Sequence, residues 1–265
     1  MQKITLYIGL LLSIGSFTAC EEVIEVELNE ANPQWVVEGQ LDATQGTAEV
    51  RVSQTGNYFG EASYLPGEGA SVSLTHQDGT RYDLVEQTAG RYAAGNIAST
   101  PGDQFTLEVE IEGETIVGQA TTQAGVTVDS LSANLQGGFF GQEEGYVVFV
   151  NFQEPAESDT YLRFHLTVNG AARNDILLYD DGLTNGAQAA FPLFPLRFKQ
   201  GDEVEVEAWA VDEASYRYFT SLSEIVGQGV GPGAAAPANP TNNLTGNSLG
   251  YFTVFSKSEA SLKIE

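Results

Sequence analysis

Apolar and polar residues alternate along most of this chain, which is the pattern of strands with one buried and one solvated face. The run QFTLEVEIEGE at 104–114 is typical, and AEVRVSQ at 48–54, TYLRFHLTVNG at 160–170 and DEVEVEAWAVD at 202–212 repeat the scheme. The run EGYVVFVNFQ at 144–153 is apolar on both faces and predicts a central strand. The positions expected inward in the first run are Phe105, Leu107, Val109 and Ile111.

Turn residues separate these runs at short intervals. Asp78-Gly79 joins two alternating segments into a predicted hairpin, and Glu112-Gly113 joins the next pair. Short strands divided in this way favour a mainly β fold of two antiparallel β-sandwich modules, Ig-like or transthyretin-like. We place the N-terminal sandwich at 34–124 and a C-terminal β-rich domain at 125–265.

One segment changes to helical spacing. Within DEASYRYFTSLSEIVGQG, a stripe from Tyr218 to Val226 predicts one amphipathic helix near 213–226, with Asp212 as its N-cap and a glycine at its end. About two dozen residues rich in Gly, Pro, Ala and Asn follow. Long loops of this kind are uncommon in compact domains and often functional, so this one is a candidate contact surface.

The first twenty residues, MQKITLYIGLLLSIGSFTAC, contain a lysine, a short apolar run and a terminal cysteine. The apolar run is shorter than the roughly 20 residues of a membrane span. The segment resembles a lipoprotein signal peptide at 1–19 with FTAC as its lipobox, which implies an acylated Cys20 held in a lipid bilayer. The alternative is a buried strand with an incidental cysteine.

An acidic tether at 20–33 follows. Glu21 and Glu22 directly after Cys20 resemble the export signal of surface lipoproteins, and the alternative interpretation is an ordinary solvated linker.

Charge narrows the classes of partner. The chain has 36 acidic and 11 basic residues, a formal net charge of −25. Such a surface repels phosphate backbones, so we expect no nucleic-acid partner.

Candidate catalytic and metal sites are weak. Ser248 lies in a G-x-S-x-G match, GNSLG, but no histidine follows it, and the expected strand–turn–helix context is missing. Of the two histidines, we expect His76 at an exposed turn and His165 on the wetter face of its strand. The segment from Asp181 lacks the ligands of an EF-hand loop, and a looser calcium site near Asp180 stays open. We therefore predict no catalytic residue, metal or cofactor.

Aromatic side chains on three glycine- or proline-rich loops are the candidate contacts for a ligand or partner. The alternative is that they seal the ends of the sandwiches. The residues are Tyr58, Phe59, Tyr64, Phe139, Phe140, Phe191 and Phe194.

Several stretches, taken in order, resemble the DUF4249 family of Bacteroidetes outer-membrane lipoproteins. They are ANPQWVVEGQLD at 31–42, GASVSLTHQDGTRYDL at 69–84, TPGDQFTLEVEIEGETIVGQATT at 100–122, QGDEVEVEAWAVDEASYRYF at 200–219 and PANPTNNLTGNSLGYFTVFS at 237–256.

The resemblance implies a surface-exposed, lipid-anchored protein of the outer membrane. It also implies a non-catalytic accessory of a TonB-dependent transporter, acting in nutrient capture or pore capping. An adhesin-like structural protein stiffened by calcium is the alternative, and a surface hydrolase is a third interpretation.

Overall fold

The computed structural model describes residues 33–56, 64–138, 144–155, 159–181, 186–227 and 239–265. The sequence-predicted residues Cys20, Glu21, Glu22, Tyr58, Phe59, Phe139 and Phe140 lie outside these ranges.

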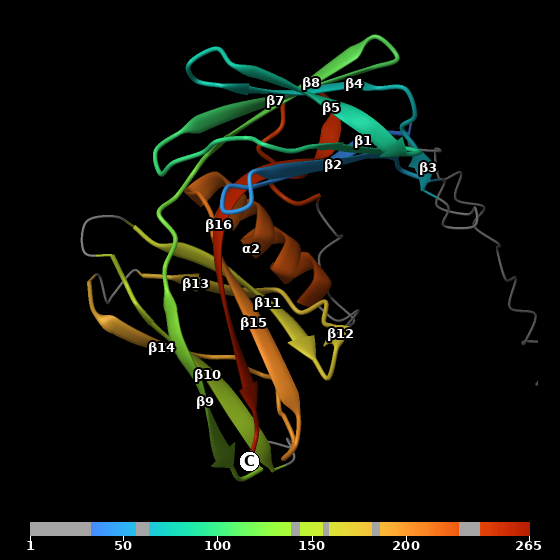
Figure 1. Cartoon of the computed structure of the whole chain (residues 1–265). Coiled ribbons are helices and arrows are strands. Elements are labelled where there is room, and N and C mark those ends of the chain that lie inside the picture. The colour runs from blue at the N-terminus through green and yellow to red at the C-terminus, as the bar shows by residue number, and fades with distance from the viewer. Residues whose placement is uncertain (1–32, 57–63, 139–143, 156–158, 182–185, 228–238) are drawn as a thin grey trace, which may run out of the picture. The chain divides into compact units, whose positions relative to one another are not determined.

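The described chain is mainly β, which confirms the predicted class (Figure 1). The helix α2 (Glu213–Gly227) is the only helix among these residues, and it is too short and too polar to span a membrane. The strands are β1 (Trp35–Asp42), β2 (Thr47–Gln54), β3 (Leu65–Pro66), β4 (Ser71–His76), β5 (Arg81–Thr88), β6 (Arg91–Ala94), β7 (Gln104–Ile111), β8 (Glu114–Thr121), β9 (Val128–Gln136), β10 (Gly145–Gln153), β11 (Tyr161–Val168), β12 (Ala171–Ala172), β13 (Leu177–Asp180), β14 (Gln188–Pro192), β15 (Glu203–Ala210) and β16 (Ser248–Lys263).

Two sheets contain these strands. The larger follows the order β12-β11-β15-β16-β1-β2-β6-β5-β4-β7-β8, with β13 on β11 and β3 on β2. The smaller has the order β14-β10-β9, so β10 is central, as its two apolar faces predict. One pairing departs from the antiparallel expectation: β1 and β16 are parallel. Parallel neighbours need a long connection, and here nearly the whole chain lies between the two strands.

Strand β16 lies between β15 and β1 in the large sheet and joins the two parts of its path. Its first half, Ser248–Phe255, pairs with β1, and its second half, Ser256–Lys263, pairs with β15. The two halves form one strand of 16 residues.

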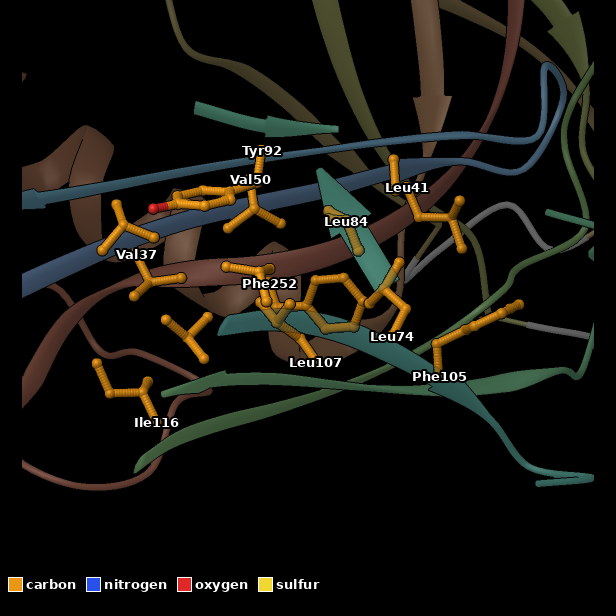
Figure 2. Close-up of a cluster of buried hydrophobic side chains, with 14 of the residues drawn as sticks. Val37, Leu41, Val50, Leu74, Leu84, Tyr92, Phe105, Leu107, Ile116 and Phe252 are labelled. Carbon is orange, nitrogen blue, oxygen red and sulfur yellow. The ribbon is translucent and has the colours of Figure 1, made fainter. Parts of the chain in front are cut away.

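The first hydrophobic core lies among the strands β1 to β8 (Figure 2). The alternation expected in β7 is confirmed, because its four apolar side chains are all buried. Phe252 and Val254 of β16 belong to the same core, and Figure 2 shows Phe252 beside Leu107. The expected module at 34–124 therefore shares its core with the C-terminal strand.

The second core collects side chains from β9, β10 and β14 and from the facing strands β11 and β15. Phe152 and Phe164 meet across it, with ring centroids 6.3 Å apart. Leu162, Leu166 and Val204 are buried, as their alternation predicts. An arrangement as two separate Ig-like or transthyretin-like sandwiches stays a prediction.

The helix α2 begins where the sequence predicts. The Asp212 carboxylate accepts a hydrogen bond from the Ser215 N–H at 2.9 Å, which satisfies one of the free donors of the first turn. Tyr218 and Phe219 pack on Tyr251 of β16. The predicted apolar stripe is not buried along its whole length, since Val226 is 70% exposed.

Candidate functional site

Ser248 has a structural role in the described chain. It begins β16 and does not stand between a strand and a helix, and its buried hydroxyl donates to the Thr245 carbonyl at 3.1 Å. Gly250 has φ +107°, and a Cβ there would lie 2.0 Å from the Val37 carbonyl oxygen. Close approach of β1 therefore explains the last glycine of the G-x-S-x-G match.

His76 is not exposed at its turn, contrary to the sequence-based expectation. Its Nδ1 lies 2.9 Å from Asp78 and its Nε2 lies 3.4 Å from Asp103, and its ring packs on Phe105. The hydrogen bond with Asp78 raises the pKa of His76, against the opposing effect of burial. This histidine joins two turns.

His165 is also more buried than its position in β11 predicts. Its ring lies 3.9 Å from the Trp209 ring, measured between centroids. Burial first, and then the positive charge of Arg163, lowers the pKa of His165 to about 3. The imidazole is therefore neutral at ordinary pH.

The described aromatic candidates have different surroundings. Phe191 is half-buried and stacks on Phe164 in the second core, with centroids 5.0 Å apart, so the structure gives it a packing role. Phe194 is 45% exposed and lines a hollow of about 580 Å³ together with Ile176 and Val226. Tyr64 is 64% exposed, and the guanidinium of Arg51 lies 5.4 Å from the centre of its ring.

Arg51 also lines the candidate site, a groove on the outer face of β1, β2 and β6. The groove has a volume of about 430 Å³, and we call it the arginine groove. This volume lies within the range of roughly 300–1,000 Å³ that small-molecule sites occupy. Its lining residues are Glu38, Gln40, Glu49, Val50, Arg51, Gln87, Thr88, Arg91, Tyr92, Ala93 and Tyr251.

Strand register places the polar side chains of the groove in two adjacent rows. The first row crosses five strands and contains Thr88, Arg91, Arg51, Glu38 and Tyr251, each directly opposite the next. The second row contains Ala93, Glu49 and Gln40, and Val85 continues it just beside the groove. Residues opposite one another in a sheet point to the same face, so both rows face the groove.

The first row sets two positive charges side by side. Arg51 and Arg91 are direct cross-strand partners, an arrangement that costs stability because like charges repel. The Arg51 guanidinium lies 3.3 Å from the Glu38 carboxylate. Arg91 has no side-chain hydrogen bond or ion pair with any residue that the structure describes. Arg91 is exposed, so water solvates its charge and the guanidinium is accessible to a ligand.

The second row adds a negative charge. Glu49 is exposed and likewise has no ion pair within the described ranges. It is the diagonal neighbour of Arg91 across β2 and β6, so the two side chains lie within reach of one ligand. The groove therefore offers a free guanidinium and a free carboxylate.

The end of the groove at Tyr251 is held by buried contacts. The Gln40 amide donates to the Tyr251 hydroxyl, and burial raises the pKa of Tyr251. The Tyr251 ring lies 5.0 Å from the Phe219 ring on α2, measured between centroids. These contacts fix Gln40 relative to the helix.

The groove was not predicted from the sequence. The two arginines are 40 positions apart, and only the register of β2 and β6 brings them together. The one usable signal was an outward arginine in each of two short strands of an acidic chain.

Asp180, near which the sequence leaves a calcium site open, lies at the end of β13. Its carboxylate accepts a hydrogen bond from the Tyr216 hydroxyl at 2.9 Å, and its neighbour Asp181 is buried. The part of the chain that the structure describes contains no group of three or more His, Cys, Asp or Glu side chains that could hold a metal ion.

Among the solved structures that this chain resembles are two chicken proteins, both with weak likeness. A two-domain fibronectin type-III segment of tenascin is 11% identical, with 68% of this chain and 91% of that chain covered, at a TM-score of 0.25. The interferon gamma receptor alpha chain is 11% identical, with 68% and 90% covered, at a TM-score of 0.19. At these scores neither likeness bears on function.

A comparison with curated proteins finds no match. The model of one protein family, described as a domain of unknown function, matches residues 21–261, which is nearly the whole chain. The chain therefore belongs to the DUF4249 family.

Proposed function

We propose that the protein is a non-catalytic binding protein, anchored by lipid at the outer membrane, that captures a nutrient for a TonB-dependent transporter. The observation that carries the binding role is the arginine groove, where Arg91 lacks a partner among the described residues and faces Arg51. An exposed guanidinium without a protein partner can form charge-assisted hydrogen bonds with an anionic group of a ligand.

The lining of the groove suits binding and orientation of a ligand. It combines guanidinium, carboxylate, amide and hydroxyl groups, all of which hydrogen-bond to small polar molecules. Tyr64 lies at the Arg51 side and adds an exposed ring, in keeping with its expected role as a contact residue. Between the two accessory roles expected from the family resemblance, a groove of this size favours nutrient capture over pore capping.

Lipid anchoring would allow a binding site of low affinity to be effective. If Cys20 carries two or more acyl chains, the domain stays at the membrane, since each buried methylene contributes about 0.8 kcal/mol. A tethered binding protein reaches an effective concentration near a transporter far above its average concentration. Weak contacts with both ligand and transporter then suffice.

The test is affinity capture of the tagged full-length protein from outer membranes of cells treated with a crosslinker. We expect a TonB-dependent transporter to be enriched over an untagged control, and Cys20→Ser to lose that enrichment together with its membrane association. Capture without any such transporter, combined with unchanged nutrient uptake in a deletion strain, would refute the accessory role.

A further inference from the structure

The arginine groove holds charges of both signs in a fixed pattern, and this pattern restricts the chemistry of its ligand. Arg91 and Glu49 have no ion pair among the residues described, and they are diagonal neighbours on one face. Arg51 and Glu38, which flank them, already pair with each other at 3.3 Å. One cation and one anion are thus left over.

From this arrangement we propose that the groove binds a small zwitterion carrying a carboxylate and an ammonium group, such as an amino acid or a short peptide. The inference rests on the proposed binding function and specifies its ligand. Arg91 receives the carboxylate, because a guanidinium fork matches two carboxylate oxygens. Glu49 receives the ammonium group, which is a compact donor without geometric demands.

A purely anionic ligand fits less well. It would meet Glu38 and Glu49 in the groove and the net charge of −25 over the whole chain, both of which oppose its approach. A purely cationic ligand would face Arg51 and Arg91. A zwitterion is neutral overall and can satisfy both unpaired groups at once.

Further groups in the groove match the middle of such a ligand. Gln40 and Thr88 can hydrogen-bond to a peptide unit, and Ala93 with the exposed Val85 forms an apolar strip beside them. The volume of about 430 Å³ suits a ligand of a few residues. The charges at the two ends of the ligand therefore determine its class, and the groove tolerates short apolar side chains between those ends.

The experiment is calorimetric titration of the full-length protein with three probes, namely trialanine, N-acetyl-trialanine and trialanine amide. We expect trialanine to bind and each blocked peptide to bind about three- to tenfold more weakly, as loss of one exposed charge pair implies.

Two variants assign each end of the peptide. Arg91→Gln should weaken the binding of trialanine by a similar factor. It should leave the affinity for trialanine amide unchanged, because that peptide has no carboxylate for Arg91 to contact. Glu49→Gln should weaken the binding of trialanine and leave the affinity for N-acetyl-trialanine unchanged, because that peptide has no ammonium group. The matched control Arg217→Gln removes an equal charge from an exposed site on α2 and should leave all three affinities unchanged.

Absence of trialanine binding at millimolar concentration would overturn the proposed ligand class, and so would equal binding by wild type and Arg91→Gln. Thermal unfolding of each variant shows that it is folded, which is expected because Arg91 and Glu49 are exposed. Failure here, with a transporter still captured from membranes, would leave the accessory role standing.

Discussion

At the scale of single residues, several side chains and glycines that look functional in the sequence prove to be fixed by their neighbours. Gly250 belongs to the apparent nucleophile motif, yet its position is dictated by the Val37 carbonyl of the parallel strand β1. His165 lies in a polar row of β11 but stacks on Trp209. In both places the neighbour is distant in sequence, so local pattern gives no warning.

Gly250→Ala should destabilise the fold by about 3 kcal/mol or more, because the new methyl group meets a backbone oxygen and the residue has a positive φ. Urea denaturation measures the loss. The matched control is Gly69→Ala, which has φ +71° but open space around the added Cβ, and it should lose only about 1 kcal/mol. Equal losses for the two variants would refute the close contact with β1.

The neutral state of His165 predicts a pH dependence. Its pKa is about 3 in the folded chain and 6.5 in the unfolded chain, so between these values the unfolded chain binds more protons and folding stability falls as pH falls. From pH 7 to pH 5 we expect a loss of about 1–2 kcal/mol. The loss is measured by denaturation at each pH, and His165→Gln should remove most of it.

The other histidine works in the opposite direction and serves as the control. The raised pKa of His76 contributes stability that is present below its unfolded pKa and is lost as pH rises through its folded value. His76→Gln should therefore leave the acid-side loss between pH 6 and pH 5 in place. If His165→Gln loses as much stability between pH 7 and pH 5 as the wild type, the inference that His165 is a buried neutral imidazole is wrong.

At the scale of elements, side-chain amides complete the strand pairing at the start of β16. The Asn243 amide donates to the Phe252 carbonyl at 2.6 Å, and its carbonyl oxygen accepts from the Phe252 N–H at 2.9 Å. Asn243 thus stands in for a neighbouring strand. Asn242 does part of the same work by donating to the Ser248 carbonyl.

Asn243→Ala should destabilise the chain by about 2–3 kcal/mol, since the Phe252 N–H loses its partner and the Phe252 carbonyl keeps only the long hydrogen bond from the Ser215 hydroxyl at 3.5 Å. Asn243→Asp tests the geometry further, because a carboxylate accepts hydrogen bonds but cannot donate to the Phe252 carbonyl. Chemical denaturation should show that Asp does not restore stability. Recovery with Asp would contradict the double contact.

The elements also show how far sequence reasoning extends. The buried face of β7, the N-cap at Asp212 and the helix α2 were predicted because their signals are local, namely alternation, a capping side chain and helical spacing. The parallel pairing of β1 with β16 and the facing arginines of the groove were not predicted. These features depend on register between strands that lie far apart along the chain.

At the scale of the whole described chain, β16 joins two hydrophobic cores. Phe252 and Val254 belong to the first core, and Leu262 packs against the second. A continuous strand cannot be withdrawn from one core without disturbing its pairing in the other.

We therefore expect one cooperative unfolding transition. Phe252→Leu in the first core and Phe164→Leu in the second should each lower the midpoint of the same transition, because each leaves a cavity in a buried cluster. Calorimetry of the full-length protein is the measurement. Two separated transitions, with each variant moving only one, would show that the cores unfold independently.

The proposed function requires that this folded unit is anchored at the membrane by lipid while its arginine groove binds the ligand. The most direct test is the intact mass of the N-terminal peptide of protein isolated from the cell envelope. We predict a chain that begins at Cys20 and carries covalently attached acyl chains. An unmodified Cys20, in protein recovered free of the envelope, would contradict it.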